Sequence, residues 1–218
     1  MFDTLEADIR ELFVDCQRML IYLQGLPNAG LHPAPLEIRS LRGLWLVNLY
    51  GVMEKSVNMI ADEIVNCIIN DAVASSSLKP SLHGVFHFPK IQALKSCGDR
   101  AVIEKSLELL RASHSAENVK LSSSPLPDKL QNVDAETIYL LCDLLSLKGH
   151  EIEVGRRGRL NNLKERRNAV AHGRETPHSV GGRFNFEGLQ DLFRITSEEV
   201  FSFMTHCKVY CEDKAYLS

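Results

Sequence analysis

The chain has 218 residues, 44% of them hydrophobic and 24% charged, and its formal net charge is −3. This length supports one sizeable hydrophobic core, and the composition excludes chain-wide disorder and a fibrous repeat. Every apolar run is far shorter than the ~20 residues of a membrane-spanning helix, and the first eight residues are acidic where a signal peptide would be basic. We therefore expect a cytoplasmic protein that does not enter a membrane.

Apolar residues at three- and four-residue spacings predict helices along most of the chain. The second of these segments is apolar on more than one face and has no internal proline, so we expect it to be the central helix. The predicted helices cover about residues 2–26, 36–74, 99–112, 135–147, 160–172 and 187–211.

Two segments between these helices have other patterns. Residues 82–89 fit either a short strand or an irregular loop, and residues 113–128 form a polar linker with three consecutive serines and two prolines. Strand signals are otherwise sparse. The sequence therefore predicts an all-α fold, a helical bundle of four main helices with an inserted middle segment. We expect residues 1–218 to form a single domain in which about residues 75–133 are a loop-rich insertion.

The six cysteines mostly stand alone within apolar helical patterns, which predicts reduced, buried thiols. Cys207 and Cys211 beside His206 would share a helix face as metal ligands, but no second cysteine pair has comparable spacing. His83 and His87 likewise lack a carboxylate or cysteine at matching spacing. We expect no metal ion and no cofactor. The motifs of phosphate-binding loops, serine hydrolases and zinc proteases are also absent from the sequence.

The charge is unevenly distributed along the chain. Residues 156–183 contain eight basic and two acidic residues, a net charge of +6, so the remainder carries −9. A basic surface on an acidic protein holds a polyanion such as RNA, and a solvated helix face is the alternative interpretation. The candidate RNA-binding residues are Arg156, Arg157, Arg159, Lys164, Arg174 and Arg183.

The most informative segment runs from Arg167 through Asn168 to His172 and Gly173. Asn168 and His172 are four residues apart and share one helix face, while Arg167 lies about 140° around the axis from His172. The long side chain of Arg167 still reaches a phosphate near His172. The last turn of a helix suits a histidine that transfers protons, because the helix dipole there favours the imidazolium ion.

The run RNAVAHG, from Arg167 to Gly173, resembles the Arg-x4-His signature of the HEPN superfamily in the form found in its bacterial predicted ribonuclease branch. The upstream run LYGVME, from Leu49 to Glu54, is similar to the second-helix pattern of some bacterial members. The resemblance implies an α-helical bundle that forms a homodimer, with Arg and His of two subunits meeting in a cleft. It also implies metal-independent RNA cleavage by the 2′-hydroxyl, which leaves a 2′,3′-cyclic phosphate and a 5′-hydroxyl.

Carried over residue by residue, the resemblance implies that His172 transfers the proton and that Arg167 stabilises the charge on the phosphorane. Asn168 would orient the substrate or His172. Glu54 is a candidate partner that holds Arg167. Arg166 also precedes His172 at a spacing that the signature allows, so Arg166 and Arg167 both stay open as the arginine that faces the cleft.

The expected function is that of a toxin or phage-defence endoribonuclease. Its expected partners are RNA, a second copy of the chain, and an antitoxin or other regulatory protein. One alternative is a non-catalytic HEPN module that dimerises and binds a nucleotide or nucleic acid. The other is a purely structural helical adaptor, for which the basic segment would be a solvated face.

Overall fold

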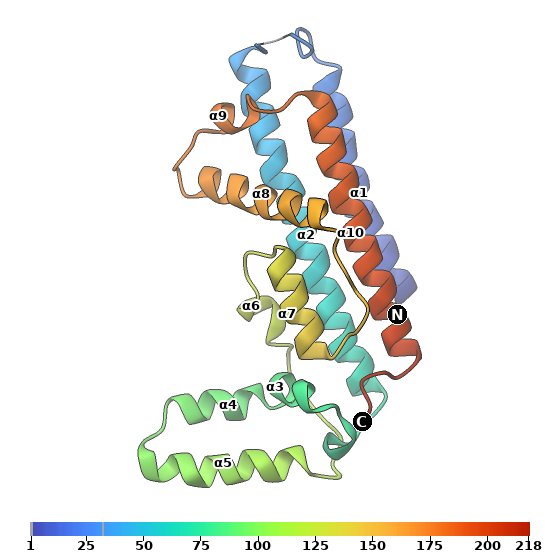
Figure 1. The fold of residues 1–218 in the computed structure, drawn as a ribbon, viewed down its shortest axis with the longest axis vertical. Coiled ribbons are helices and arrows are strands. Elements are labelled where there is room, and N and C mark those ends of the chain that lie inside the picture. The colour runs from blue at the N-terminus through green and yellow to red at the C-terminus, as the bar shows by residue number, and fades with distance from the viewer. Residues whose placement is uncertain (1, 32) are drawn as a thin grey trace. The chain divides into compact units, whose positions relative to one another are not determined.

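The computed structural model describes residues 2–31 and 33–218, without the side chains of Asp128 and Lys129. Within this described part every regular element is helical, and sheet-like pairing is limited to two isolated bridges (Figure 1). The all-α prediction is confirmed. The elements are α1 (Phe2–Gln24), α2 (Leu36–Asn70), the 3-10 helices η1 (Ser75–Ser77) and η2 (Pro80–Leu82), α3 (His83–Phe86), α4 (Phe88–Lys95), α5 (Asp99–Ser113), α6 (Leu126–Lys129), α7 (Ala135–Leu145), α8 (Val154–Ala171), α9 (Pro177–Gly181) and α10 (Phe186–Glu212).

Two regions differ from the sequence prediction. Helix α8 starts several residues before the predicted position, in spite of two glycines in its first turns. Arg156, between those glycines, pairs with Glu153 and Glu198, and these ion pairs support the early start. Residues 82–89 are neither a strand nor an irregular loop, because they comprise the end of η2, all of α3 and the beginning of α4. Pro89 occupies a position in the first turn of α4 that suits proline.

The contacts divide the chain into two compact units, and the helices α2, α7 and α10 contribute residues to both. Unit 1 comprises Met1–Met59, Asn132–Ile138 and Glu151–Met204. Unit 2 comprises Ile60–Gln131, Tyr139–His150 and Thr205–Ser218.

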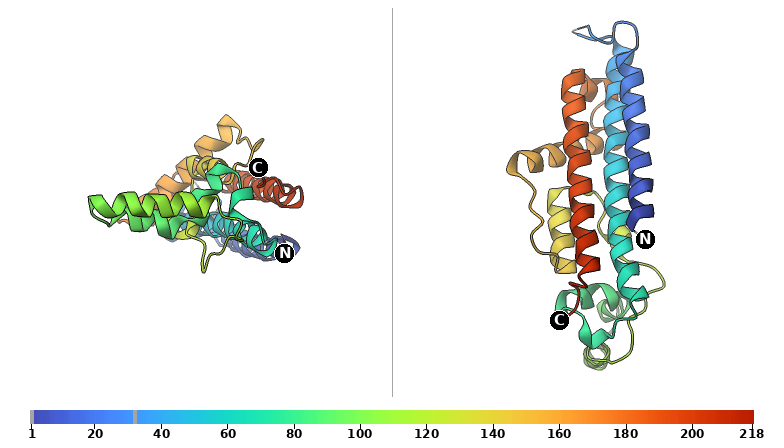
Figure 2. Two further views of the ribbon diagram at one scale, coloured as in Figure 1. Left: turned by 90° about the horizontal axis from the view of Figure 1, so that it is seen from below. Right: turned by 90° about the vertical axis from the view of Figure 1, so that its right-hand side faces the viewer.

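In unit 1, α1, α10 and the N-terminal part of α2 lie side by side, and α8 runs at a steep angle to them (Figures 1 and 2). The three long helices pack through apolar side chains. Trp45 of α2 is fully buried and donates its indole N–H to the carbonyl oxygen of Cys16 in α1, over 2.9 Å. The ring of Phe13 in α1 packs against Phe193 and Phe201 of α10, with centroids 5.9 and 5.7 Å apart. These contacts hold α1, α2 and α10 together within unit 1.

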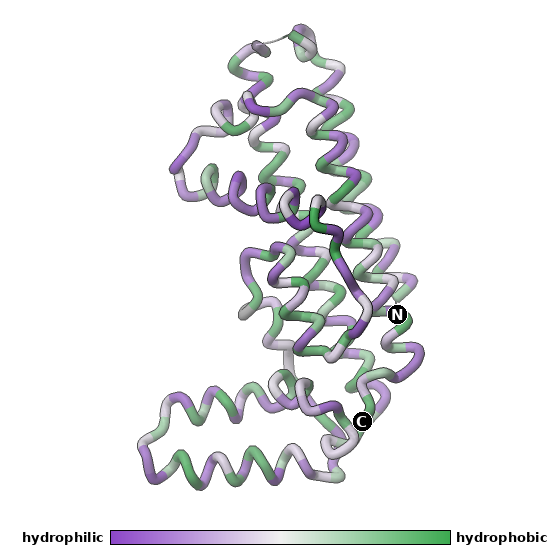
Figure 3. Tube along the Cα trace, in the orientation of Figure 1, coloured by the Kyte–Doolittle hydropathy of each residue, from purple (hydrophilic) through white to green (hydrophobic). Residues whose placement is uncertain are grey.

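Helix α8 is mostly hydrophilic (Figure 3), and its buried residues are Leu160, Leu163 and Ala169. The short helix that follows it, α9, is fixed to α2 by close backbone contacts. A Cβ atom on Gly181 would lie 2.0 Å from the carbonyl oxygen of Arg39, so only glycine fits there. The end of α8 is therefore followed by a segment that is itself anchored within unit 1.

In unit 2, the last residues of the chain are held by hydrogen bonds and an ion pair to the segment that follows α2. The hydroxyl of the buried Tyr216 donates a hydrogen bond to the carboxylate of Asp71, which also forms a 2.9 Å ion pair with Lys214. The backbone N–H of Lys79 donates to the carbonyl oxygen of Tyr216 over 3.0 Å. In the same unit, α4 and α5 form a helical hairpin (Figures 1 and 2).

Candidate active site

The C-terminal end of α8 carries the predicted catalytic residues. Gly173 adopts a positive φ of 66°, which ends the helix at Ala171 and leaves His172 as the C-terminal cap. The backbone N–H of His172 still donates to the carbonyl oxygen of Asn168, over 3.0 Å. The last turn is therefore well formed, and it presents Arg167, Asn168 and His172 on one short stretch of helix.

The guanidinium of Arg167 is held on several sides. Its Nη2 lies 3.1 Å from Oε2 of Glu54 in α2, and its Nη1 donates to Oδ1 of Asn132 over 3.1 Å and to Oδ1 of Asn168 over 2.9 Å. The guanidinium carbon also stands 4.5 Å from the centre of the Tyr50 ring. We call Glu54, Asn132, Asn168 and Tyr50 the arginine clamp. The carboxylate of Glu54 is thus an ion-pair partner of Arg167.

Glu54 organises the arginine clamp because it accepts hydrogen bonds from three directions. In addition to Arg167, it accepts the backbone N–H of Asn132 over 2.8 Å and the hydroxyl of Tyr50 over 3.1 Å. Tyr50 is fully buried, and burial together with the nearby Glu54 carboxylate raises the pKa of Tyr50. The phenol therefore stays protonated and acts as a hydrogen-bond donor to Glu54.

The loop before α7 ties α7 to α8 through two polar residues. Asn132 has a positive φ of 62°, a conformation that asparagine tolerates, and contributes both its backbone N–H and its side-chain oxygen to the arginine clamp. Two residues later, Asp134 caps α7 by accepting from the N–H and hydroxyl of Thr137, and it pairs with Lys164 of α8. Burial alone would raise the pKa of Asp134, but the hydrogen bonds from Lys164 and Thr137 lower it.

His172 has different surroundings from Arg167. Its side chain is exposed to solvent and makes no hydrogen bond or ion pair with the residues that the structure describes. Asn168, expected to orient either the substrate or His172, instead directs its side-chain oxygen to Arg167. The structure therefore joins Arg167, Asn168 and Glu54 through direct contacts, and it places His172 beyond them at the end of the same helix.

The two candidate arginines also differ in their contacts. Arg166 donates from Nε to Oδ1 of Asn162 over 3.3 Å and lies 3.8 Å from the carboxylate of Glu175. It makes no hydrogen bond or ion pair with Glu54 or Asn132 in the described part of the chain. Arg167 is thus the arginine that belongs to the clamp.

Most candidate RNA-binding residues already form ion pairs or hydrogen bonds within unit 1. The net charge of residues 156–183 therefore overstates the positive charge that is free to bind RNA. Acidic residues outside the segment pair with Arg156, Arg159 and Lys164. Arg157 donates to the carbonyl oxygen of Ile152, and Arg183 pairs with Glu175. Arg174 is exposed, and its side chain makes no hydrogen bond or ion pair with the described residues.

Sequence reasoning missed Asn132 and the role of Tyr50. The sequence before α7 reads Asn132-Val133-Asp134, which is a good signal for a turn and a helix cap. No local signal connects that turn with an arginine 35 positions later. Only tertiary contact between the loop and α8 brings the two together.

Among the described residues, no group of three or more His, Cys, Asp or Glu side chains has the arrangement of a metal site. None of the described helices combines the length and the apolar character needed to cross a membrane.

No curated protein and no solved structure matches this chain. The model of the RiboL-PSP-HEPN family matches residues 12–212, which include α8, Glu54 and the loop that carries Asn132. HEPN domains are often ribonucleases. The chain belongs to the RiboL-PSP-HEPN family, within the HEPN superfamily.

Proposed function

We propose that this protein is a metal-independent endoribonuclease whose catalytic residues are Arg167 and His172. The observation that carries the proposal is the contrast between these two side chains. Arg167 is fixed by the arginine clamp, whereas His172 is exposed and has no partner among the described residues. A fixed cation and an available imidazole supply charge stabilisation and proton transfer, the two needs of phosphodiester transesterification.

In the proposed reaction the 2′-oxygen of RNA attacks the adjacent phosphorus while the bond to the 5′-oxygen breaks. The proton of the 2′-hydroxyl passes to a neutral His172 ring, and the departing 5′-oxygen takes a proton from an imidazolium. In a homodimer, His172 of each of two subunits would fill one of these roles. The products are a 2′,3′-cyclic phosphate end and a 5′-hydroxyl end.

Arg167 would stabilise the extra negative charge on the phosphorane. A guanidinium has five N–H donors, and the contacts to Glu54, Asn132 and Asn168 use three of them. The remaining donors are available to non-bridging phosphate oxygens. Because the arginine clamp already orients the group, little reorganisation is needed when charge develops.

The wider proposal is a toxin or phage-defence effector that cuts single-stranded or looped RNA and is restrained by an antitoxin or other regulatory protein. The extensive ion pairing of the basic segment supports selective contact with RNA rather than strong general attraction, because few of its cations are unneutralised. Arg174 is the candidate for a direct phosphate contact.

The direct test is cleavage of total cellular RNA in EDTA, with end-group analysis of the products. Wild type should give cyclic phosphate ends, and His172→Ala should lose about 10²- to 10⁴-fold in rate. His114→Ala is the matched control, because His114 is an exposed histidine of unit 2. Absence of cleavage by folded wild-type protein under all conditions would favour the non-catalytic binding module. Equal cleavage rates of the two variants would show that His172 is not the catalytic histidine.

A further inference from the structure

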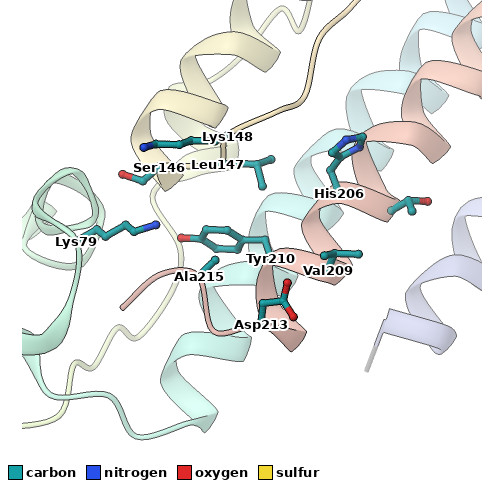
Figure 4. Close-up of a pocket in the computed structure, with 10 residues that line it drawn as sticks. Lys79, Ser146, Leu147, Lys148, His206, Val209, Tyr210, Asp213 and Ala215 are labelled. Carbon is teal, nitrogen blue, oxygen red and sulfur yellow. The ribbon is translucent and has the colours of Figure 1, made fainter. Parts of the chain in front are cut away.

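A pocket of about 460 Å³ lies within unit 2, bounded by the end of α10, the residues after α7 and the residue before η2 (Figure 4). Its wall is largely apolar and includes Leu147, Val209 and Tyr210. Val209 leaves 49% of its surface exposed, so the pocket retains apolar surface that unit 2 itself does not cover. This volume falls in the range of small-molecule sites. No residue of the pocket belongs to the arginine clamp.

Charged side chains stand at opposite sides of this apolar wall. Lys79 and Lys148 flank Ser146 on one side, and Asp213, the residue after α10, lies on the other (Figure 4). None of the three charged groups makes a hydrogen bond or ion pair through its side chain with the residues that the structure describes. In unit 1, by contrast, most charged groups near the arginine clamp are paired.

The two lysines are not needed to cap the end of α7. Ser146, at a positive φ of 53°, and Leu147 donate their backbone N–H groups to the carbonyl oxygens of Asp143 and Cys142. The carbonyl oxygen of Leu145 accepts the hydroxyl of Tyr210, over 2.5 Å. Three of the last carbonyl oxygens of α7, those of Cys142, Asp143 and Leu145, thus have donors other than lysine. The lysine ammonium groups remain available to a ligand.

We propose that this pocket binds a nucleoside monophosphate. Its phosphate lies with Lys79 and Lys148, because two ammonium groups match a dianion. Its base covers the apolar wall at Val209 and Leu147, and ribose hydroxyls donate to the carboxylate of Asp213, as acidic residues do in other nucleotide sites. The distribution of charge on either side of an apolar wall distinguishes this ligand from a simple anion.

The test is isothermal titration calorimetry of the full chain with AMP, adenosine and inorganic phosphate. Wild type should bind AMP at least tenfold more tightly than either adenosine or phosphate. The double variant Lys79→Ala/Lys148→Ala should bind AMP at least tenfold more weakly and adenosine within twofold of wild type. Asp213→Ala should weaken both AMP and adenosine severalfold, because both carry the ribose hydroxyls.

The control is Lys95→Ala/Lys120→Ala, which removes the same charge from two exposed lysines of unit 2 that do not line the pocket. It should bind AMP like wild type, and thermal unfolding should show that all variants fold. The proposal is overturned by absence of AMP binding at millimolar concentration, by phosphate binding as tight as that of AMP, or by equal AMP affinity in the two double variants. RNA cleavage has no part in this test, so its result is independent of the proposed ribonuclease.

Discussion

Arg167 lies in the last turns of α8 and His172 caps the same helix five residues later, yet the surroundings of the two side chains are opposite. The Arg167 side chain is 24% exposed and is held by the arginine clamp, whereas the His172 side chain is exposed and unpaired among the described residues. The difference matches two chemical tasks. A group that stabilises charge works best when it is fixed, and a group that transfers protons must be reachable by substrate.

The largest expected effects on RNA cleavage come from replacing either of these two residues. The two variants should differ in their free energy of unfolding. We expect Arg167→Ala and His172→Ala each to lower RNA cleavage by about 10²-fold or more. Arg167→Ala should also lower the free energy of unfolding by about 1–3 kcal/mol, because Glu54 loses its cation inside the clamp. Urea unfolding measures the contrast. A destabilisation of similar size in His172→Ala would show that the histidine has a structural role.

The next effect concerns Glu54, the centre of the arginine clamp. Glu54→Ala removes the acceptor of three hydrogen bonds, so we expect a loss of about 1–3 kcal/mol in unfolding free energy and a fall in cleavage of about 10- to 100-fold. Glu54→Gln keeps one acceptor oxygen and should recover part of the stability. If folded Glu54→Ala protein cut RNA at the wild-type rate, the inference that Glu54 positions Arg167 for catalysis would be wrong.

The backbone and side-chain contributions of Asn132 to the arginine clamp can be separated by substitution. Asn132→Gly keeps the positive φ and the backbone N–H that reaches Glu54, but it removes the oxygen that accepts from Arg167. We expect a severalfold loss in kcat with little change in KM. Asn132→Ala should cost about 1 kcal/mol more in stability than the glycine variant, since alanine is strained at positive φ. Equal stability of the glycine and alanine variants would argue against a positive φ at residue 132.

The smallest predicted effect concerns the charge available to RNA. Glu175 neutralises Arg166 and Arg183, so Glu175→Gln should tighten RNA binding about threefold near 0.1 M salt and steepen its salt dependence. Glu165→Gln is the control, because Glu165 is exposed and makes no ion pair among the described residues. Filter binding across a salt series measures both. Identical behaviour of the two variants would show that pairing with Glu175 does not mask the arginines.

Several features could be read from the chain because they depend on neighbours in sequence. The apolar spacing predicted the long helices, and Gly173 marked the end of α8. The early start of α8 and the helical form of residues 82–89 were missed. In both places short-range propensity is weak, and contacts such as the ion pair of Arg156 with Glu198 decide the outcome.

The sequence by itself determined the all-α fold and the placement of Arg167, Asn168 and His172 near one helix end, because helical spacing is local. Tertiary structure alone decided that Arg167 rather than Arg166 meets Glu54 and Asn132, which lie on other segments of the chain. It also decided how much of the basic segment is neutralised. Ion pairs and hydrogen bonds form between groups that folding brings within about 3 Å, and no local pattern encodes those distances.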